Sequence, residues 1–367
     1  MLGPDSLKSH EPMTIPQPLR KFAGLAFCVA LSSGFSGCSS NIETPDGTAG
    51  TSSVAGSSAS TGTSGSTSTT AGTNGGGAPS TGSNEVVGTF QVQIQVDEAD
   101  STKGMTKIVG QVGDGPVPAN VVWTVVKEEG GCRLETPKSP FCEAGCGSDV
   151  CVADGKCQAY PTGHSVGAVT LKGVQLVGGG SAIALKEIAK AYQPPSGTML
   201  AYPPFAQGDD ISVHAEGGDY TAFDLATKGV DPLSLTSTDF ELEEDKALTL
   251  TWDAPSDPKS AQVYVKVDIS HHGGAKGKIE CDVDDTGSLT ISPAMMTELI
   301  GLGVAGYPSV VVMRQSIDSA KISPGVVRLE VSARTEQYLT VKGYTSCTVD
   351  EDCPTGKTCR TSDSTCQ

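Results

Sequence analysis

Alternation of apolar and polar residues recurs along the chain from about residue 85 onward. The pattern is clearest at residues 90–96, 248–252, 263–270 and 327–332. It predicts half-buried strands, because successive side chains of a strand point to opposite faces of a sheet. Further strands are expected between clusters of Gly, Pro and Asp, at 121–126, 169–177, 211–215 and 310–313. We therefore expect a mainly β fold, an antiparallel β-sandwich built as one large or two smaller sandwiches.

One short helix is expected in this strand-rich part. Ser292 and Pro293 offer an N-cap and a first-turn proline, an apolar face follows, and Gly301 is a stop signal. The segment 182–192 fits a helix or a strand, and both remain open. A break at 231–246 would separate two sandwiches, and alternation within its acidic run favours an edge strand over an acidic binding site.

Residues 1–37 have the pattern of a leader. A basic pair precedes an apolar stretch at 22–31, and Gly-Phe-Ser-Gly leads to Cys38. About ten apolar residues are too few for a transmembrane helix, which needs roughly 20, so a secretory signal is predicted. The small residues before Cys38 resemble the lipobox of bacterial lipoproteins, which implies that Cys38 is acylated and binds the lipid membrane. The alternatives are a plain signal peptide and an internal start at Met13.

Residues 38–84 are expected to be a tether behind that anchor. Positions 39–84 hold 12 Ser, 10 Thr and 10 Gly, with no aromatic residue, Lys or Arg. Such a stretch cannot bury enough apolar surface to fold. As a flexible coil it would reach roughly 35–40 Å. Ser39 stands where lipoproteins kept in the inner membrane have Asp, so the resemblance favours the outer membrane.

The charge balance restricts the possible partners. The chain has 42 acidic and 25 basic residues and a formal net charge of -17. Phosphate backbones and anionic headgroups would repel it, so a nucleic-acid partner is not expected. An extracellular or periplasmic protein or a polysaccharide is compatible with this charge.

Ten cysteines follow the predicted anchor. In an exported protein they are expected to form disulfides, and the alternative of zinc lacks a Cys-x-x-Cys pair. The last four can pair among themselves in three ways. The first five form an odd cluster that needs Cys281 as a sixth member. The candidates are Cys132, Cys142, Cys146, Cys151, Cys157, Cys281, Cys347, Cys353, Cys359 and Cys366.

Two resemblances refine this organisation. The tail CTVDEDCPTGKTCRTSDSTC is similar to Cys-rich repeats of the form C-x-x-D-x-D-C-P-x-G-x-x-C. With the lipobox, the tether and the segment DISHHGG, the chain resembles a family of uncharacterised myxobacterial lipoproteins, which implies a location and no activity. LTLTWDAP, from residue 248, resembles the start of a fibronectin type III domain. The expected parts of the body are 85–230 with a Cys-rich insertion at 132–157, a sandwich at 231–343 and a tail at 344–367.

Two motifs resemble catalytic signatures. GHSVG at 163–167 matches the nucleophile elbow, which would make Ser165 the nucleophile of a serine hydrolase. The elbow needs a strand before it and a helix after it, whereas a Cys-rich loop precedes Ser165 and a β-branched run follows. GLGVAG at 301–306 matches a dinucleotide fingerprint, but the predicted helix precedes it instead of following it. We therefore expect no enzyme and no cofactor.

Two further groups are candidate ligand sites. His271 and His272, with Asp282 and Asp284, are the best candidates for a metal cluster, against the alternative of polar turns. Aromatic residues in Pro-rich loops could stack on sugar rings or could instead pin the loops to the sandwich. The glycan candidates are Tyr192, Tyr202 and Phe205.

The sequence thus favours a non-enzymatic, lipid-anchored envelope protein whose β body serves binding or envelope structure. The second hypothesis is a glycan-binding surface module, and the third is a hydrolase at Ser165.

Overall fold

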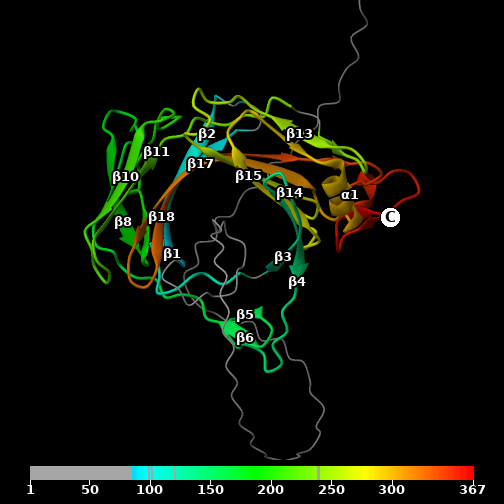
Figure 1. Cartoon of the computed structure of the whole chain (residues 1–367), viewed down its shortest axis with the longest axis horizontal. Helices are drawn as coiled ribbons and strands as arrows, with labels where there is room; N and C mark the ends of the chain where they lie inside the picture. Colours follow the sequence, from blue (N-terminus) through cyan, green and yellow to red (C-terminus); the bar gives the residue numbers. More distant parts are fainter. Residues whose placement is uncertain (1–84, 98–99, 101, 120, 238–239) are drawn as a thin grey trace, which may run out of the picture. The chain divides into compact units, whose positions relative to one another are not determined.

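The computed structural model describes residues 85–97, 100, 102–119, 121–237 and 240–367. These residues form a 13-stranded sheet, four small two-stranded sheets and one α-helix (Figure 1). Within the large sheet β1 and β18 run parallel, and the other neighbouring strands pair antiparallel. The predicted mainly β, largely antiparallel fold with one short helix and a disulfide-rich tail is confirmed.

The element bounds are as follows. In sheet order the large sheet contains β11 (Phe223–Lys228), β10 (Asp210–Ala215), β7 (Val169–Lys172), β8 (Ala182–Ile188), β9 (Ala191–Gln193), β2 (Gly104–Val112), β1 (Val86–Val96), β18 (Val326–Tyr338), β17 (Ser309–Lys321), β14 (Gln262–Asp268), β15 (Lys278–Asp284), β4 (Cys132–Lys138) and β3 (Val122–Glu129). The small sheets pair β12 (Glu241–Leu242) with β19 (Thr340–Val341), β13 (Leu248–Thr251) with β16 (Ser288–Ile291), β20 (Cys359–Arg360) with β21 (Thr365–Cys366), and β5 (Val150–Ala153) with β6 (Lys156–Gln158). The helices are α1 (Pro293–Gly301) and the 3₁₀ turn η1 (Asp350–Asp352).

Two hydrophobic cores share one face of the large sheet. In the first core, β1, β2 and β18 pack against β7, β8, β10 and β11 from the far end of the same sheet. In the second, β14, β15 and β17 pack against β13, β16 and α1. Strands from both predicted ranges, 85–230 and 231–343, hydrogen bond in this one sheet.

Local sequence explains helix α1 and also the structure of the segment 182–192, which was left open between helix and strand. Helix α1 begins after Ser292, whose side chain accepts a hydrogen bond from the Met295 amide, and it buries Met295, Met296 and Leu299 in the second core. The segment 182–192 forms the hairpin β8–β9. Its two-residue turn, Ala189 and Lys190, has φ of 50° and 67°, which suits the twist of a hairpin.

A buried ion pair lies where the two cores meet. Arg314 on β17 has Ala333 and Val263 as its neighbours across the sheet, one from each core. Its guanidinium contacts the Asp285 carboxylate at 2.5 Å, and both side chains are almost fully buried. Asp285 also accepts a hydrogen bond from Trp252 Nε1 at 2.7 Å. Arg314 further donates to the carbonyls of Asp231 and Asp253, so it holds two loops against the sheet.

Candidate functional site

The ten cysteines of the described part form five disulfides, as predicted. The pairs are Cys132–Cys281, Cys142–Cys151, Cys146–Cys157, Cys347–Cys359 and Cys353–Cys366. Cys281 is the sixth member of the first cluster, and its bond links β15 to β4. The predicted anchor, Cys38, lies outside the described residues.

Ser165 belongs to a hydrogen-bonded network in which His164 does not contact its hydroxyl. The Ser165 hydroxyl donates to Glu187 at 2.5 Å and lies 3.3 Å from the Tyr192 hydroxyl. His164 Nδ1 lies instead 3.3 Å from Asp219, which also accepts a hydrogen bond from the Ser165 amide. The hydrogen bond from Ser165 holds the pKa of Glu187 below its usual value, so this carboxylate is a weak base. The segment after Ser165 leads into strand β7, where an elbow would have a helix.

Replacement of Ser165 by alanine is expected to lower the free energy of unfolding by about 1 kcal/mol, because Glu187 and Tyr192 lose a shared hydrogen-bond partner. Urea denaturation measures this change, with Ser148→Ala at an exposed position as control. Labelling of Ser165 in the wild-type protein by a fluorophosphonate probe would contradict a structural role.

The aromatic side chains selected as glycan candidates are mostly inside the protein. Tyr192 and Phe205 are 0% and 2% exposed and belong to the first core, so neither ring face is open to a sugar. The half-buried Tyr202 packs against the same core. For Tyr192 and Phe205 the glycan assignment is wrong, because these rings fill the space between the layers of the sandwich.

The four metal candidates are not gathered around one point. Within the described residues, the groups with suitably close ligand atoms contain only disulfide-bonded cysteines. Asp282 is engaged by Arg133 at 3.0 Å, and Asp284 is exposed. The rings of His271 and His272 contact each other at a tilt of 53°, with centroids 3.9 Å apart. Burial and the neighbouring His272 lower the pKa of His271, which keeps this imidazole neutral at pH 7.

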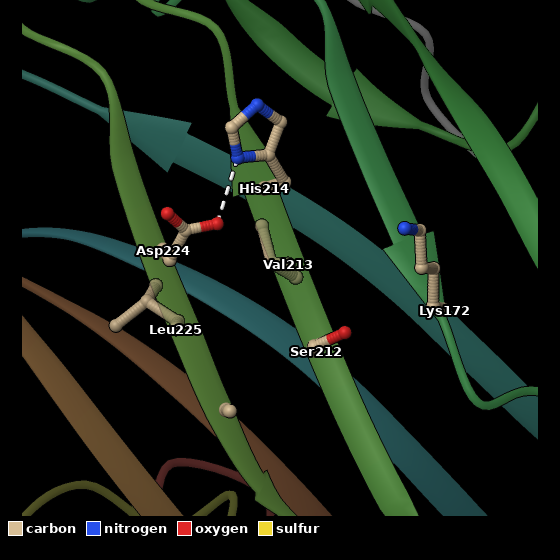
Figure 2. A pocket seen from close by; sticks show the side chains of 7 residues that line it. Lys172, Ser212, Val213, His214, Asp224 and Leu225 are labelled. Carbon is tan, nitrogen blue, oxygen red and sulfur yellow. Dashed lines mark hydrogen bonds and ion pairs between the residues drawn. The ribbon is translucent and has the colours of Figure 1, made fainter.

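A shallow hollow lies on the outer surface of β7, β10 and β11 (Figure 2). His214 Nδ1 lies 2.7 Å from Asp224 there, and half of the His214 side chain is exposed. The Ser212 hydroxyl points away from the His214 ring (Figure 2). The hollow therefore holds an exposed histidine–aspartate contact and no nucleophile–base pair.

The face of the large sheet opposite the cores is mainly polar, with Val311 and Met313 among its apolar side chains, and we name it the polar sheet face. Neither hydrophobic core includes side chains from this face. On the central strands β1, β18 and β17 it presents amide, hydroxyl and charged groups in register, among them Gln91, Gln93, Gln95, Glu330, Ser332, Arg334, Glu336 and Gln315.

One end of the polar sheet face, on β4 and β15, carries an alternating set of charges. Lys278 contacts Glu280 and lies 3.1 Å from Glu135, and its ammonium is 4.5 Å from the Trp123 ring centroid. Burial disfavours the charged form of Arg133, but the nearby carboxylates together outweigh the effect of burial. The pKa of Arg133 is therefore raised. These side chains neutralise one another. The set therefore stabilises strand pairing at this end of the sheet and does not present a surface of one charge to a ligand.

A second group on the polar sheet face combines one exposed and one half-buried tyrosine ring with a fixed carboxylate. We name Tyr338, Tyr307, His271, Glu336 and Arg334 the Tyr338 cluster. Tyr338 ends β18 and is 63% exposed. Its ring and that of Tyr307 meet edge to face, with centroids 6.2 Å apart.

Glu336 lies at the centre of this cluster. It accepts hydrogen bonds from Arg334 at 2.5 Å and from the Ser309 hydroxyl at 3.2 Å, and His271 Nε2 lies 3.9 Å away. Burial opposes ionisation, but the hydrogen bonds from Arg334 and Ser309 together with the nearby positive charge outweigh it and lower the pKa of Glu336. Sequence reasoning missed the cluster. Its one local signal is a tyrosine that prolongs the alternating strand at 327–332.

Comparison with protein-family models and with curated proteins gives no match for this chain.

Proposed function

We propose that this protein is an exported, lipid-anchored envelope protein that displays a disulfide-bonded β body for binding or for envelope structure. The observation that carries the proposal is the pairing of all ten cysteines of the described part into five disulfides. Such bonds form and persist in oxidising compartments outside the cytoplasm. None of the described helices has the length and apolar character needed to cross a bilayer. Acylation of Cys38 would supply the membrane attachment, and the segment 39–84 the tether.

Binding is favoured over a purely structural role by the polar sheet face. It carries Tyr338, an aromatic side chain that is 63% exposed, beside an ordered carboxylate and guanidinium. A few well-placed polar groups next to an aromatic surface are typical of ligand sites. Glycan binding is therefore the second candidate function.

Replacement of Cys38 by alanine is expected to abolish membrane attachment, because the thiol is the predicted acceptor of the diacylglycerol group. The measurement is fractionation of cells fed an alkyne-labelled palmitate, followed by click detection. Wild type should be labelled and membrane-bound, and Cys38→Ala should be unlabelled. Cys28→Ala, in the predicted leader, is the matched control and should behave like wild type. Unlabelled wild-type protein would overturn the proposed anchor.

A further inference from the structure

We propose that the Tyr338 cluster on the polar sheet face is a binding site for an uncharged saccharide, with Tyr338 as the stacking ring and Glu336 and Arg334 as the hydrogen-bonding pair. This inference names the ligand class of the proposed display module and rests on that function.

The stacking surface comes from Tyr338. A ring that is 63% exposed at the end of a 13-residue strand, on a rigid sheet, offers an apolar face at little cost in conformational entropy. Tyr307 meets it edge to face and fixes its orientation. The C–H face of a pyranose ring can pack on such a surface.

The polar half of the site is held in position before a ligand arrives. Arg334 and Ser309 orient Glu336, so that its carboxylate can accept hydrogen bonds from sugar hydroxyls, and Arg334 can donate them. Gln95 is the partner of Arg334 on β1, and it extends the row of polar groups across the strands.

The Cys-rich tail braces the aromatic side of the site. Tyr344 donates to the Gly306 carbonyl at 3.3 Å, and the Gly306 amide donates to the Asp363 carbonyl at 2.7 Å. The disulfide-bonded module at 344–367 therefore fixes the loop that places Tyr307 beside Tyr338.

The charges of the cluster and of the whole chain favour an uncharged saccharide over an acidic one. Glu336 and Arg334 neutralise each other, and His271 is neutral at pH 7. The chain as a whole carries a formal net charge of -17, which repels anionic polymers. A neutral sugar surface with many hydroxyl groups fits these conditions, whereas an acidic polysaccharide does not.

The test is isothermal titration calorimetry of the purified full-length protein in detergent. The probes are β-1,4-linked hexasaccharides of glucose and of N-acetylglucosamine. We expect binding of at least one probe, a loss of about tenfold or more in affinity for Tyr338→Ala, and a smaller loss for Glu336→Gln. Tyr160→Ala, at a tyrosine that is 54% exposed near the Cys-rich insertion, should bind like wild type. Circular dichroism melts verify that each variant is folded.

Absence of binding to every probe, or equal affinity of Tyr338→Ala and Tyr160→Ala, would overturn the saccharide site. That result is distinguishable from failure of the proposed function, because anchoring through Cys38 is measured in cells and does not depend on sugar binding. If anchoring fails but Tyr338-dependent sugar binding is retained, the proposed lipid-anchored display is rejected and the saccharide site stands.

Discussion

Replacement of both Cys132 and Cys281 by alanine is expected to lower the free energy of unfolding by about 5 kcal/mol. The two residues are 149 positions apart and form a disulfide, so the bond closes a very long loop. In the chain-entropy model, a longer closed loop removes more conformational freedom from the unfolded chain and stabilises the fold further. Guanidinium denaturation without reductant gives the change directly.

The Cys142–Cys151 pair provides the matched control. Its sequence separation is only 9, so its removal should cost about 3 kcal/mol on the same model. A smaller loss for Cys132 and Cys281 than for this control would contradict the role of the long-range bond as the main covalent constraint on the sheet.

Replacement of Asp285 by alanine is expected to lower the free energy of unfolding by about 3–5 kcal/mol, because it leaves the Arg314 charge buried without a partner. Arg314 is 3% exposed and lies between the two cores, where water cannot replace the lost carboxylate. The Trp252 indole also loses its acceptor. Urea denaturation followed by tryptophan fluorescence measures the effect.

Asp284→Ala tests whether the loss is specific to the buried acid. Asp284 is the preceding residue but is exposed, so its removal should change stability by less than about 0.5 kcal/mol. The double variant Asp285→Leu with Arg314→Met should recover part of the loss, since no unpaired charge remains. Equal stabilities of Asp285→Ala and Asp284→Ala would contradict the buried ion pair.

The strands and the membership of Cys281 in the first cysteine cluster were predictable, because alternation is a local signal and cysteines can be counted, whereas the partner Cys132 was not. Alternation at 90–96 and 263–270 reports directly which side chains face a core, and an odd cluster of five cysteines needs a sixth. The end of β7 at Lys172 was not predicted. The apolar run continues to Val177, but Gly173 has φ of 95° and interrupts the strand.

The Arg314–Asp285 pair and the Tyr338 cluster were missed because each depends on contacts between distant segments. Asp285 has the sequence context of a turn, and only the packing of β17 buries it. The glycan assignment selected Tyr192 from a Pro-rich loop, yet that ring fills the core, whereas Tyr338 at a strand end is exposed. The packing of the layers decides whether an aromatic side chain is exposed or buried, and the sequence around that residue does not reveal the outcome.

Trapping of thiols in living cells shows whether the β body is exported and disulfide-bonded. Cells are quenched with acid, and the protein is treated with a polyethylene glycol maleimide before and after reduction. We expect no gel shift before reduction and addition at ten cysteines after it, since the five disulfides form outside the cytoplasm. Modification of these cysteines without reductant would show a reduced body and would contradict export.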